Sequence, residues 1–232
     1  MSAEKFYSQG KTLFDQEKYD EALSFFHKAL KDNPHHPLSL YGRALSYFKL
    51  QQFQQSIHDF DKLINLVPNN ATYHSERGVA LHLAGDNELA LKDFDKAVEL
   101  EPENPYRYSS RAYVKDRAKD FQGAVDDYTK AIELDPEDAI AYNNRGLVEE
   151  KLGYAEKAKY SFNRADELNL PPLNPTSKQE NIRPLNEEGR IAPESSSKNS
   201  IKNYLQVMGS VFTSRQNLKE FFDFVGNKFR RS

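Results

Sequence analysis

The chain has 232 residues, of which 38% are hydrophobic and 29% are charged, and it contains no cysteine. This composition excludes disulfides and thiolate metal sites, and no run of 18 apolar residues is present that could form a transmembrane helix. Residues 1–5 lack the apolar core of a secretory signal, so we expect the cytoplasm to be the compartment.

The net charge of −3 conceals an asymmetry along the chain. Residues 1–170 carry 22 basic and 29 acidic side chains, whereas residues 171–232 carry 10 basic and 6 acidic ones. An acidic body repels phosphate backbones, so nucleic acid is not an expected partner. The basic C-terminal segment could be attracted to that body, to an acidic partner or to an anionic membrane.

From the N-terminus, five similar segments of about 34 residues follow one another. They cover residues 3–36, 37–70, 71–104, 105–138 and 139–171. The first four carry a proline at the same place, and the proline of the fifth comes one place late: Pro34, Pro68, Pro102, Pro136 and Pro171. Each segment contains two amphipathic stretches whose apolar residues are three and four positions apart. This pattern predicts five helical hairpins, which must stack because one hairpin cannot bury its apolar face alone.

Several positions keep the same type of residue in all five segments. Small residues recur at Gly10, Ala44, Gly78, Ala112 and Gly146, and at Ala22, Ser56, Ala90, Ala124 and Ala158. Rings recur at Phe26, Phe60, Phe94, Tyr128 and Phe162, each three residues before Ala29, Leu63, Ala97, Ala131 or Ala165. Small residues let two helices approach closely, and a ring fills the space that the next hairpin closes.

These positions resemble the signature of the tetratricopeptide repeat family. The resemblance covers residues 3–171 and implies an all-α fold, a right-handed superhelix (α-solenoid) of five helical hairpins. It also implies a scaffold that binds a protein or peptide rather than an enzyme. Three residues depart from the signature: His74 stands where a large apolar residue is expected, and Lys115 and Glu149 predict looser packing within the last two hairpins.

Arginines recur every 34 residues, at Arg43, Arg77, Arg111 and Arg145. Aspartates keep nearly the same spacing at Asp59, Asp93 and Asp127. The first segment has Gln9 and Phe25 at the two corresponding places, so arginine and aspartate are missing there together. Because a partly buried guanidinium needs a carboxylate partner, we interpret these residues as a structural ion-pair ladder rather than a ligand site.

In the tetratricopeptide family, the first helix of each hairpin faces a concave groove. The resemblance therefore assigns the following residues to a groove that binds a partner: Tyr7, Lys11, Phe14, Tyr41, Leu45, Phe48, Val79, His82, Leu83, Tyr106, Ser110, Tyr113, Arg117, Asn144 and Leu147, with Lys151 beyond them. An apolar and aromatic groove suits an amphipathic helix or an extended peptide.

Some family members hold a chaperone's C-terminal carboxylate with converging lysine, asparagine and arginine side chains. At those places this chain has Tyr7, Lys11, Gly42, Thr72 and Glu76, and shifting the frame by one or two hairpins does not restore the set. Because a carboxylate needs several cationic or amide donors, a chaperone carboxylate is not an expected ligand.

Residues 172–198 are rich in proline, serine and charge without apolar periodicity, which predicts a flexible linker. Residues 199–231 regain helical spacing and predict an amphipathic helical tail, with a capping box at Thr213–Gln216 and a basic end. The apolar residues that we expect to dock are Leu205, Met208, Phe212, Leu218, Phe221, Phe222, Val225 and Phe229. The receiving surface could be the array itself, a partner protein or a membrane, although Glu220 and Asp223 weaken the membrane alternative.

The sequence contains no Gly-rich phosphate loop, nucleophile elbow or zinc-binding pair, so we expect no catalytic residues, metal or cofactor. The function predicted is that of a scaffold or adaptor whose groove or tail joins components of a complex. The alternative is a peripheral membrane tether, in which the tail lies on anionic lipid and the array presents a partner.

Overall fold

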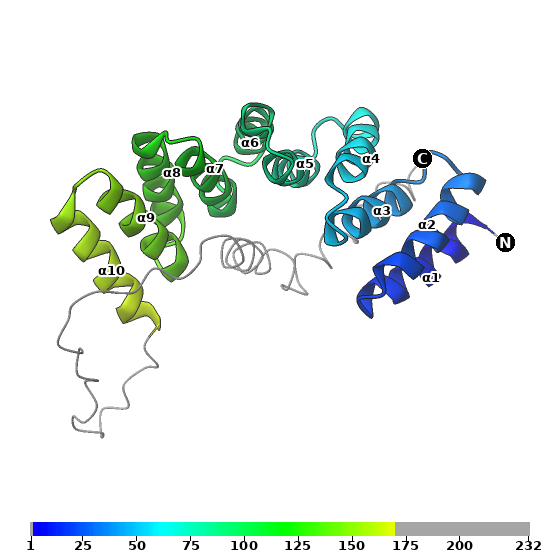
Figure 1. Ribbon diagram of the computed structural model, residues 1–232, viewed down its shortest axis with the longest axis horizontal. Helices are drawn as coiled ribbons and strands as arrows, with labels where there is room; N and C mark the ends of the chain where they lie inside the picture. Colours follow the sequence, from blue (N-terminus) through cyan, green and yellow to red (C-terminus); the bar gives the residue numbers. More distant parts are fainter. Residues whose placement is uncertain (1, 170–232) are drawn as a thin grey trace, which may run out of the picture. The chain divides into compact units, whose positions relative to one another are not determined.

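The computed structural model describes residues 2–169, which form ten α-helices and no strand within that range (Figure 1). The helices are α1 (Ala3–Asp15), α2 (Tyr19–Asp32), α3 (Pro37–Lys49), α4 (Phe53–Leu66), α5 (Ala71–Leu83), α6 (Asn87–Leu100), α7 (Pro105–Arg117), α8 (Phe121–Leu134), α9 (Ala139–Lys151) and α10 (Ala155–Asn169). This arrangement confirms the predicted all-α fold of five stacked hairpins. The predicted linker (172–198), the amphipathic tail (199–231) and its docking residues lie outside the described residues.

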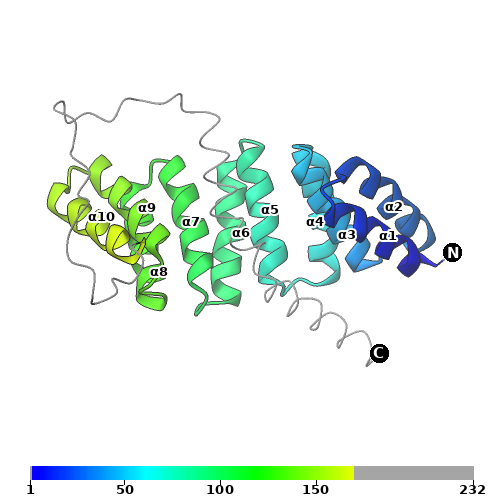
Figure 2. The same ribbon diagram turned by 90° about the horizontal axis from the view of Figure 1, so that it is seen from below.

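Within residues 2–169, each helix packs against its neighbours in chain order, as the view from below shows (Figure 2). In the middle of the array, α3 and α5 lie on its inner side and α4 and α6 on its outer side (Figure 1). The odd-numbered helices also contact one another across hairpins, with α1 against α3, α5 against α7 and α7 against α9. A ring contact between Tyr41 of α3 and Tyr73 of α5 joins the remaining pair, so the first helices of successive hairpins form one continuous inner face.

The repeated rings and small residues form the core between the helices. Phe26, Phe60, Phe94 and Tyr128 are at most 2% exposed. A Cβ atom at Gly42 of α3 would lie 2.5 Å from the Phe26 ring, and one at Gly10 of α1 would lie 2.8 Å from it. The Phe26 ring thus packs directly on glycine backbone of α1 and of α3. Gly78 and Gly146 have the same close contact with Phe94 and Phe162 of their own hairpins, which explains the small residue at the place of Gly10.

Local signals in the sequence set the helix boundaries. The side chains of Asn70, Asp86 and Asp120 accept a hydrogen bond from a backbone N–H in the first turn of α5, α6 and α8. At the turn before α6, Gly85 has a φ of 95°, a conformation that glycine adopts without steric cost, and Gly153 plays the same role before α10 with a φ of 77°.

The predicted ion-pair ladder is confirmed. Arg43 donates to both carboxylate oxygens of Asp59 at 2.6 and 2.7 Å, and Arg77 and Arg111 bind Asp93 and Asp127 in the same two-pronged way. The remaining terminal nitrogen of the guanidinium reaches the preceding hairpin, since Arg77 Nη1 lies 2.7 Å from Asp61 and Arg111 Nη1 lies 2.8 Å from Asp95. The ladder therefore ties helices within a hairpin and successive hairpins to each other.

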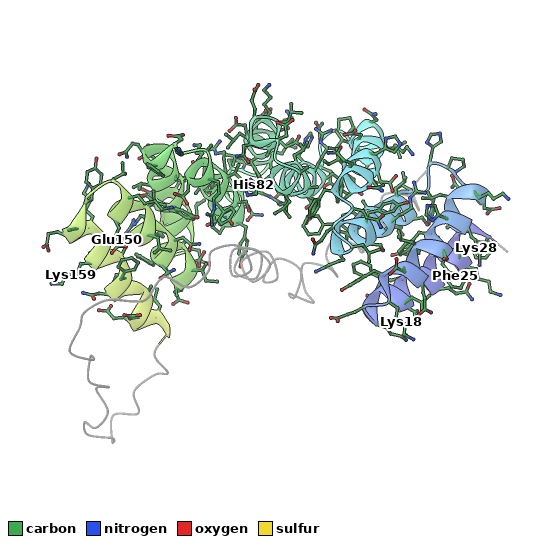
Figure 3. All side chains as sticks on the ribbon, in the orientation of Figure 1. Lys18, Phe25, Lys28, His82, Glu150 and Lys159 are labelled. Carbon is green, nitrogen blue, oxygen red and sulfur yellow. The ribbon has the colours of Figure 1, made fainter. Side chains whose placement is uncertain are left out.

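In the first hairpin, which lacks the ladder, Phe25 occupies the place of the aspartate. The ammonium of Lys28 lies 4.7 Å from the centre of its ring, a cation–π contact along α2 (Figure 3).

The three departures from the family signature take part in this ladder. His74 is buried, with its ring nitrogens 3.1 Å from Asp93 Oδ1 and 2.9 Å from the carbonyl oxygen of Pro68. Lys115 lies 2.8 Å from Asp127, and Glu149 accepts a hydrogen bond from Ser161 at 2.7 Å. Lys115 thus forms an ion pair between α7 and α8, at a place where the sequence had suggested looser packing. Glu149 forms a hydrogen bond between α9 and α10, and its ionic contact, at 3.6 Å, is with Arg145 of its own helix.

No helix within residues 2–169 is long and apolar enough to cross a lipid bilayer.

Candidate functional site

The inner face of the array is built from the helix sides that point away from the other helices. On α7, Tyr106, Ser110, Tyr113 and Arg117 are three or four positions apart and therefore form one stripe, whereas Ala112 and Val114 face neighbouring helices and are fully buried. On α9, Ile140, Asn144, Leu147 and Lys151 form the corresponding stripe. Side chains of adjacent hairpins thus lie in rows across the inner face.

The structure divides the fifteen predicted groove residues by exposure. Tyr7, Leu45, Phe48 and Val79 are buried. The partly exposed members are Lys11, Phe14, Tyr41, His82, Leu83, Ser110, Tyr113 and Asn144. Tyr106, Arg117 and Leu147 are exposed, with 37% of Tyr106 and 46% of Leu147 accessible. The more accessible part of the predicted groove is thus its C-terminal half, over α7 and α9.

Aromatic contacts join the helices in the N-terminal half of the array. The ring of Tyr41 lies 6.1 Å from Phe60 and 5.7 Å from Tyr73, measured between ring centres, and Tyr7 lies 5.7 Å from His36. Burial raises the pKa of Tyr73 to about 12 and that of Tyr41 well above its usual range. Tyr73 is only 1% exposed and Tyr41 is partly exposed, so these two rings mainly pack the helices together and offer little accessible surface.

A cluster of three side chains connects α5 and α7 on the inner face. The ring of His82 (Figure 3) meets the Tyr113 ring edge-on at 5.7 Å, and the Arg117 guanidinium lies 5.1 Å from the centre of the same ring. His82 Nδ1 also lies 2.6 Å from the side-chain oxygen of Asn87. Burial, followed by a smaller contribution from nearby Arg117, lowers the pKa of His82 and favours its neutral form.

The next contact along the inner face is ionic. Lys151 of α9 donates to both carboxylate oxygens of Asp116 on α7, at 2.6 and 2.7 Å. With Arg117 beside it, this pair places charged groups next to the exposed Leu147. An apolar strip bordered by paired charges is the composition expected of a protein-binding surface.

The structure adds residues that sequence reasoning did not assign to the groove. Ile140 is 41% exposed and precedes Leu147 by two helical turns, so both lie on the same stripe of α9. Ile140 is the second residue of its segment, as Tyr106 is of the segment before. An apolar residue at the same place as a predicted groove residue was the signal in the sequence that could have identified it.

Glu76 of α5 is the second addition, and it is only 2% exposed. Burial raises its pKa to about 8, although the nearby positive charges of Arg107 and Lys49 act in the opposite direction. Arg107 is itself held by Glu101 at 2.8 Å and by Ser75 at 3.0 Å. The signal in the sequence was an acid at a place where the other segments have Ser8, Gly42, Ser110 and Asn144.

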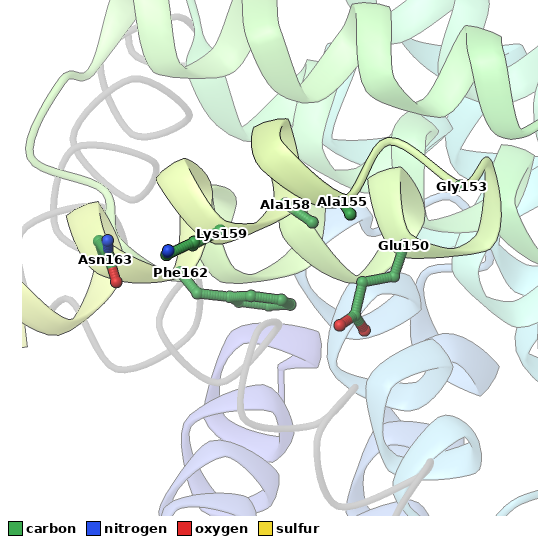
Figure 4. Close-up of a pocket in the computed structure, with 7 residues that line it drawn as sticks. All are labelled: Glu150, Gly153, Ala155, Ala158, Lys159, Phe162 and Asn163. Atoms are coloured by element: carbon green, nitrogen blue, oxygen red, sulfur yellow. The ribbon is translucent and has the colours of Figure 1, made fainter.

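A depression of about 500 Å³ lies at the last hairpin, lined by Glu150, Gly153, Ala155, Ala158, Lys159, Phe162 and Asn163 (Figure 4). Phe162 is partly exposed here, unlike its equivalents in the other hairpins. Lys159 and Asp166 stand where the earlier segments have apolar residues, namely Leu23, Ile57, Leu91 and Val125 for the first place and Leu30, Ile64, Val98 and Ile132 for the second. The last hairpin therefore has polar residues around the ring of Phe162, and a polar outer face is typical of the terminal repeat of a helical array.

Within the described residues, no three His, Asp or Glu side chains are grouped in a way that could hold a metal ion.

Stacked helical hairpins with a continuous inner face define the class of helical-repeat proteins. Comparison with family profiles identifies the repeat. Profiles described as tetratricopeptide or TPR repeats match residues 41–105, 118–153 and 139–171, and a profile of subunit 3 of the anaphase-promoting complex, or cyclosome, matches residues 1–63. The chain belongs to the tetratricopeptide repeat family, and its described part is a protein–protein interaction domain.

Solved structures with the same fold include two relatives named MamA. One is 23% identical, covers 68% of this chain and 93% of its own, and has a TM-score of 0.65. The other, from Desulfovibrio magneticus RS-1, is 21% identical over 72% of this chain and 94% of its own, with a TM-score of 0.68.

A third relative is YrrB, described as a TPR protein with an unusual peptide-binding site. It is 21% identical over 71% of this chain and 84% of its own, with a TM-score of 0.60. At these identities the similarity establishes the fold. A search of curated proteins found no significant match.

Proposed function

We propose that the protein is a scaffold or adaptor whose inner face binds an apolar or amphipathic segment of a partner protein. The observation that carries this proposal is the exposed strip over α7 and α9, where Tyr106, Ile140 and Leu147 are each more than a third exposed. Large apolar side chains grouped on one face and bordered by charges favour association with another protein.

The inner-face tyrosines favour a peptide over a small metabolite. Tyrosine offers a large rigid contact area together with a hydroxyl group, and it is enriched among the residues that contribute most to protein binding. The inner face extends over five hairpins, so it can follow an extended or helical segment over several turns. YrrB, whose structure is described as containing a peptide-binding site, has the same fold.

The sequence of residues 199–231 supports a second role in the same scaffold. Its predicted apolar stripe, from Leu205 to Phe229, would provide an additional docking element for a partner. Lipid is the alternative target for this stripe. Flotation of the full-length protein with vesicles containing phosphatidylserine distinguishes the two, because a scaffold without a lipid role stays in the unbound fraction.

The first prediction concerns the inner face. We expect the double variant Tyr106→Ser/Leu147→Ser to lose at least tenfold in affinity for its partner, since removing two large contact residues costs about 1–2 kcal/mol each. The measurement is a quantitative pull-down from native lysate, with the partner then purified and titrated by calorimetry.

The matched control is Leu89→Ser, which removes an apolar side chain that is 45% exposed on α6, away from the predicted groove residues. We expect this variant to capture the inner-face partner as the unaltered protein does. Equal capture by the unaltered protein, the double variant and the control would contradict the proposal that the inner face binds the partner.

A further inference from the structure

The ion-pair ladder is incomplete at its last arginine. Arg77 and Arg111 each contact two aspartates, one in their own hairpin and one in the hairpin before. For Arg145, Ser161 stands at the first of these places and Thr129 at the second. The guanidinium has been kept while both carboxylates have been replaced by hydroxyl groups.

The first hairpin shows that this combination is unusual within the array. There, the arginine and the aspartate are both absent, with Gln9 and Phe25 in their places. An arginine that lacks both ladder aspartates and keeps only Glu149, at 3.6 Å, therefore does not follow from the packing of the repeat alone.

The contacts that remain around Arg145 are weaker than those of the complete ladder. Its Nε atom lies 3.1 Å from the Ser161 hydroxyl and 3.6 Å from the Glu149 carboxylate, and its Nη1 atom lies 3.4 Å from the Thr129 hydroxyl. In the complete ladder, Arg77 and Arg111 lie 2.6–2.8 Å from carboxylate oxygens. Guanidinium bonds to carboxylates are about twice as strong as bonds to neutral groups, so the donors of Arg145 are under-used.

The structure has a groove at this place. About 520 Å³ of space lies between α8 and α10, lined by Arg145, Thr129, Lys157 and Tyr160 together with Glu149 and other residues. We call this space the outer groove. Tyr160 is 57% exposed, and tyrosine and arginine are the residue types that most often dominate protein interfaces.

We propose that the outer groove is a second protein-binding site, which receives an aspartate or glutamate side chain of a partner protein. The carboxylate takes the place that Asp61 and Asp95 occupy in the complete ladder and accepts hydrogen bonds from the Arg145 guanidinium. An apolar or aromatic residue next to it in the partner packs on Tyr160.

The charges around the groove favour one carboxylate over a phosphate. Arg145 and Lys157 contribute two positive charges, whereas Asp126, Glu149 and Glu156 contribute three negative ones. Gln122 donates to Asp126 at 2.8 Å, and Ser161 donates to Glu149 at 2.7 Å, so two of these acids already have partners. A phosphate with a charge near −2 would meet more repulsion here than a singly charged carboxylate.

The test replaces the missing carboxylate within the chain. In the full-length variant Thr129→Asp, the new side chain should bind Arg145 as Asp95 binds Arg111 and should therefore block the site. Thr129→Ala keeps the space open without adding a charge, and Gln55→Asp adds the same charge at an exposed place on α4. Urea unfolding checks that all three variants remain folded, and we expect Thr129→Asp to be at least as stable as the unaltered protein.

The probe is the blocked peptide acetyl-Tyr-Glu-Tyr-amide, with acetyl-Tyr-Gln-Tyr-amide as its uncharged match and inorganic phosphate as a third ligand. Binding is followed by nuclear magnetic resonance at the Arg145 Nε–H group and at the amides of residues 129 and 160. We expect the glutamate peptide to bind at least fivefold more tightly than the glutamine peptide. We also expect Thr129→Asp to weaken it at least fivefold, whereas Thr129→Ala and Gln55→Asp change it less than twofold.

Equal binding of the two peptides, or unchanged binding to Thr129→Asp, would overturn the site. Tighter binding of phosphate than of the glutamate peptide would overturn the assignment to a carboxylate. Because the inner-face variants leave this groove unaltered, failure here is distinguishable from failure of the proposed inner-face function.

Discussion

Replacing Asp93 with alanine is expected to lower the free energy of unfolding by about 3–5 kcal/mol, the cost of removing one partner of a buried ion pair. Asp93 is 4% exposed and accepts two hydrogen bonds from Arg77, at 2.6 and 2.7 Å, with a ring nitrogen of His74 3.1 Å away. Without this carboxylate, the two basic side chains lose their common partner in the middle of the array.

The measurement is urea-induced unfolding of the full-length protein, followed by circular dichroism at 222 nm. Asp95→Ala is the matched control, since Asp95 lies two residues further along α6, binds Arg111 at 2.8 Å and is largely exposed. We expect this control to cost less than about 1 kcal/mol. Similar losses of unfolding free energy in Asp93→Ala and Asp95→Ala would contradict the expectation that a buried ion pair of the ladder contributes more to stability than an exposed one.

Replacing Glu76 with glutamine is expected to stabilise the protein at alkaline pH. Burial raises the pKa of Glu76 from 4.5 to about 8, so the folded protein keeps a proton that the unfolded chain has lost. The unfolded chain binds fewer protons between these two values, and stability therefore falls as the pH rises from about 4.5 to about 8. A shift of this size corresponds to a loss on the order of 3–5 kcal/mol.

Because glutamine carries no charge, Glu76→Gln should remove this fall. We expect the difference in unfolding free energy between the variant and the unaltered protein to grow from near zero at pH 5 to a few kcal/mol at pH 8.5. Glu88→Gln, at an exposed carboxylate on the next helix, should follow the unaltered protein across this range. If the unfolding free energies of the unaltered protein and Glu76→Gln changed with pH in parallel, the folded protein would tolerate the charged form of Glu76 and the prediction would be wrong.

The fold could be predicted because its signals repeat. The spacing of 34 residues, together with the ring and small residue of each segment, specifies both the hairpins and the way in which they stack. The ladder could also be predicted from the first segment. It has Gln9 at the place of the arginine and Phe25 at the place of the aspartate, so the two residue types are missing there together. A repeat shows which residues depend on each other even within a single sequence.

Details within individual hairpins were harder to predict, because they depend on distances across helices. Lys115 and Glu149 looked like disruptions of an apolar contact, yet both lie close to ladder residues and become ionic partners. The groove prediction was limited in the same way. Spacing places Val79 and Leu147 at equivalent positions, but Val79 is fully buried and Leu147 is 46% exposed.

The proposed function depends most on the inner face being the surface that meets a partner. Site-specific photo-crosslinking tests this directly. p-Benzoylphenylalanine replaces Tyr106 on α7 in one protein and Leu89 on α6 in another, and each is irradiated in native lysate.

Both positions carry large apolar side chains that are more than a third exposed, so the substitution is mild at the two places. We predict a discrete protein adduct at position 106 that is reduced at least fivefold by adding Leu147→Ser, and no such adduct at position 89. Absence of an adduct at position 106, or an adduct that forms there regardless of Leu147, would contradict the central claim.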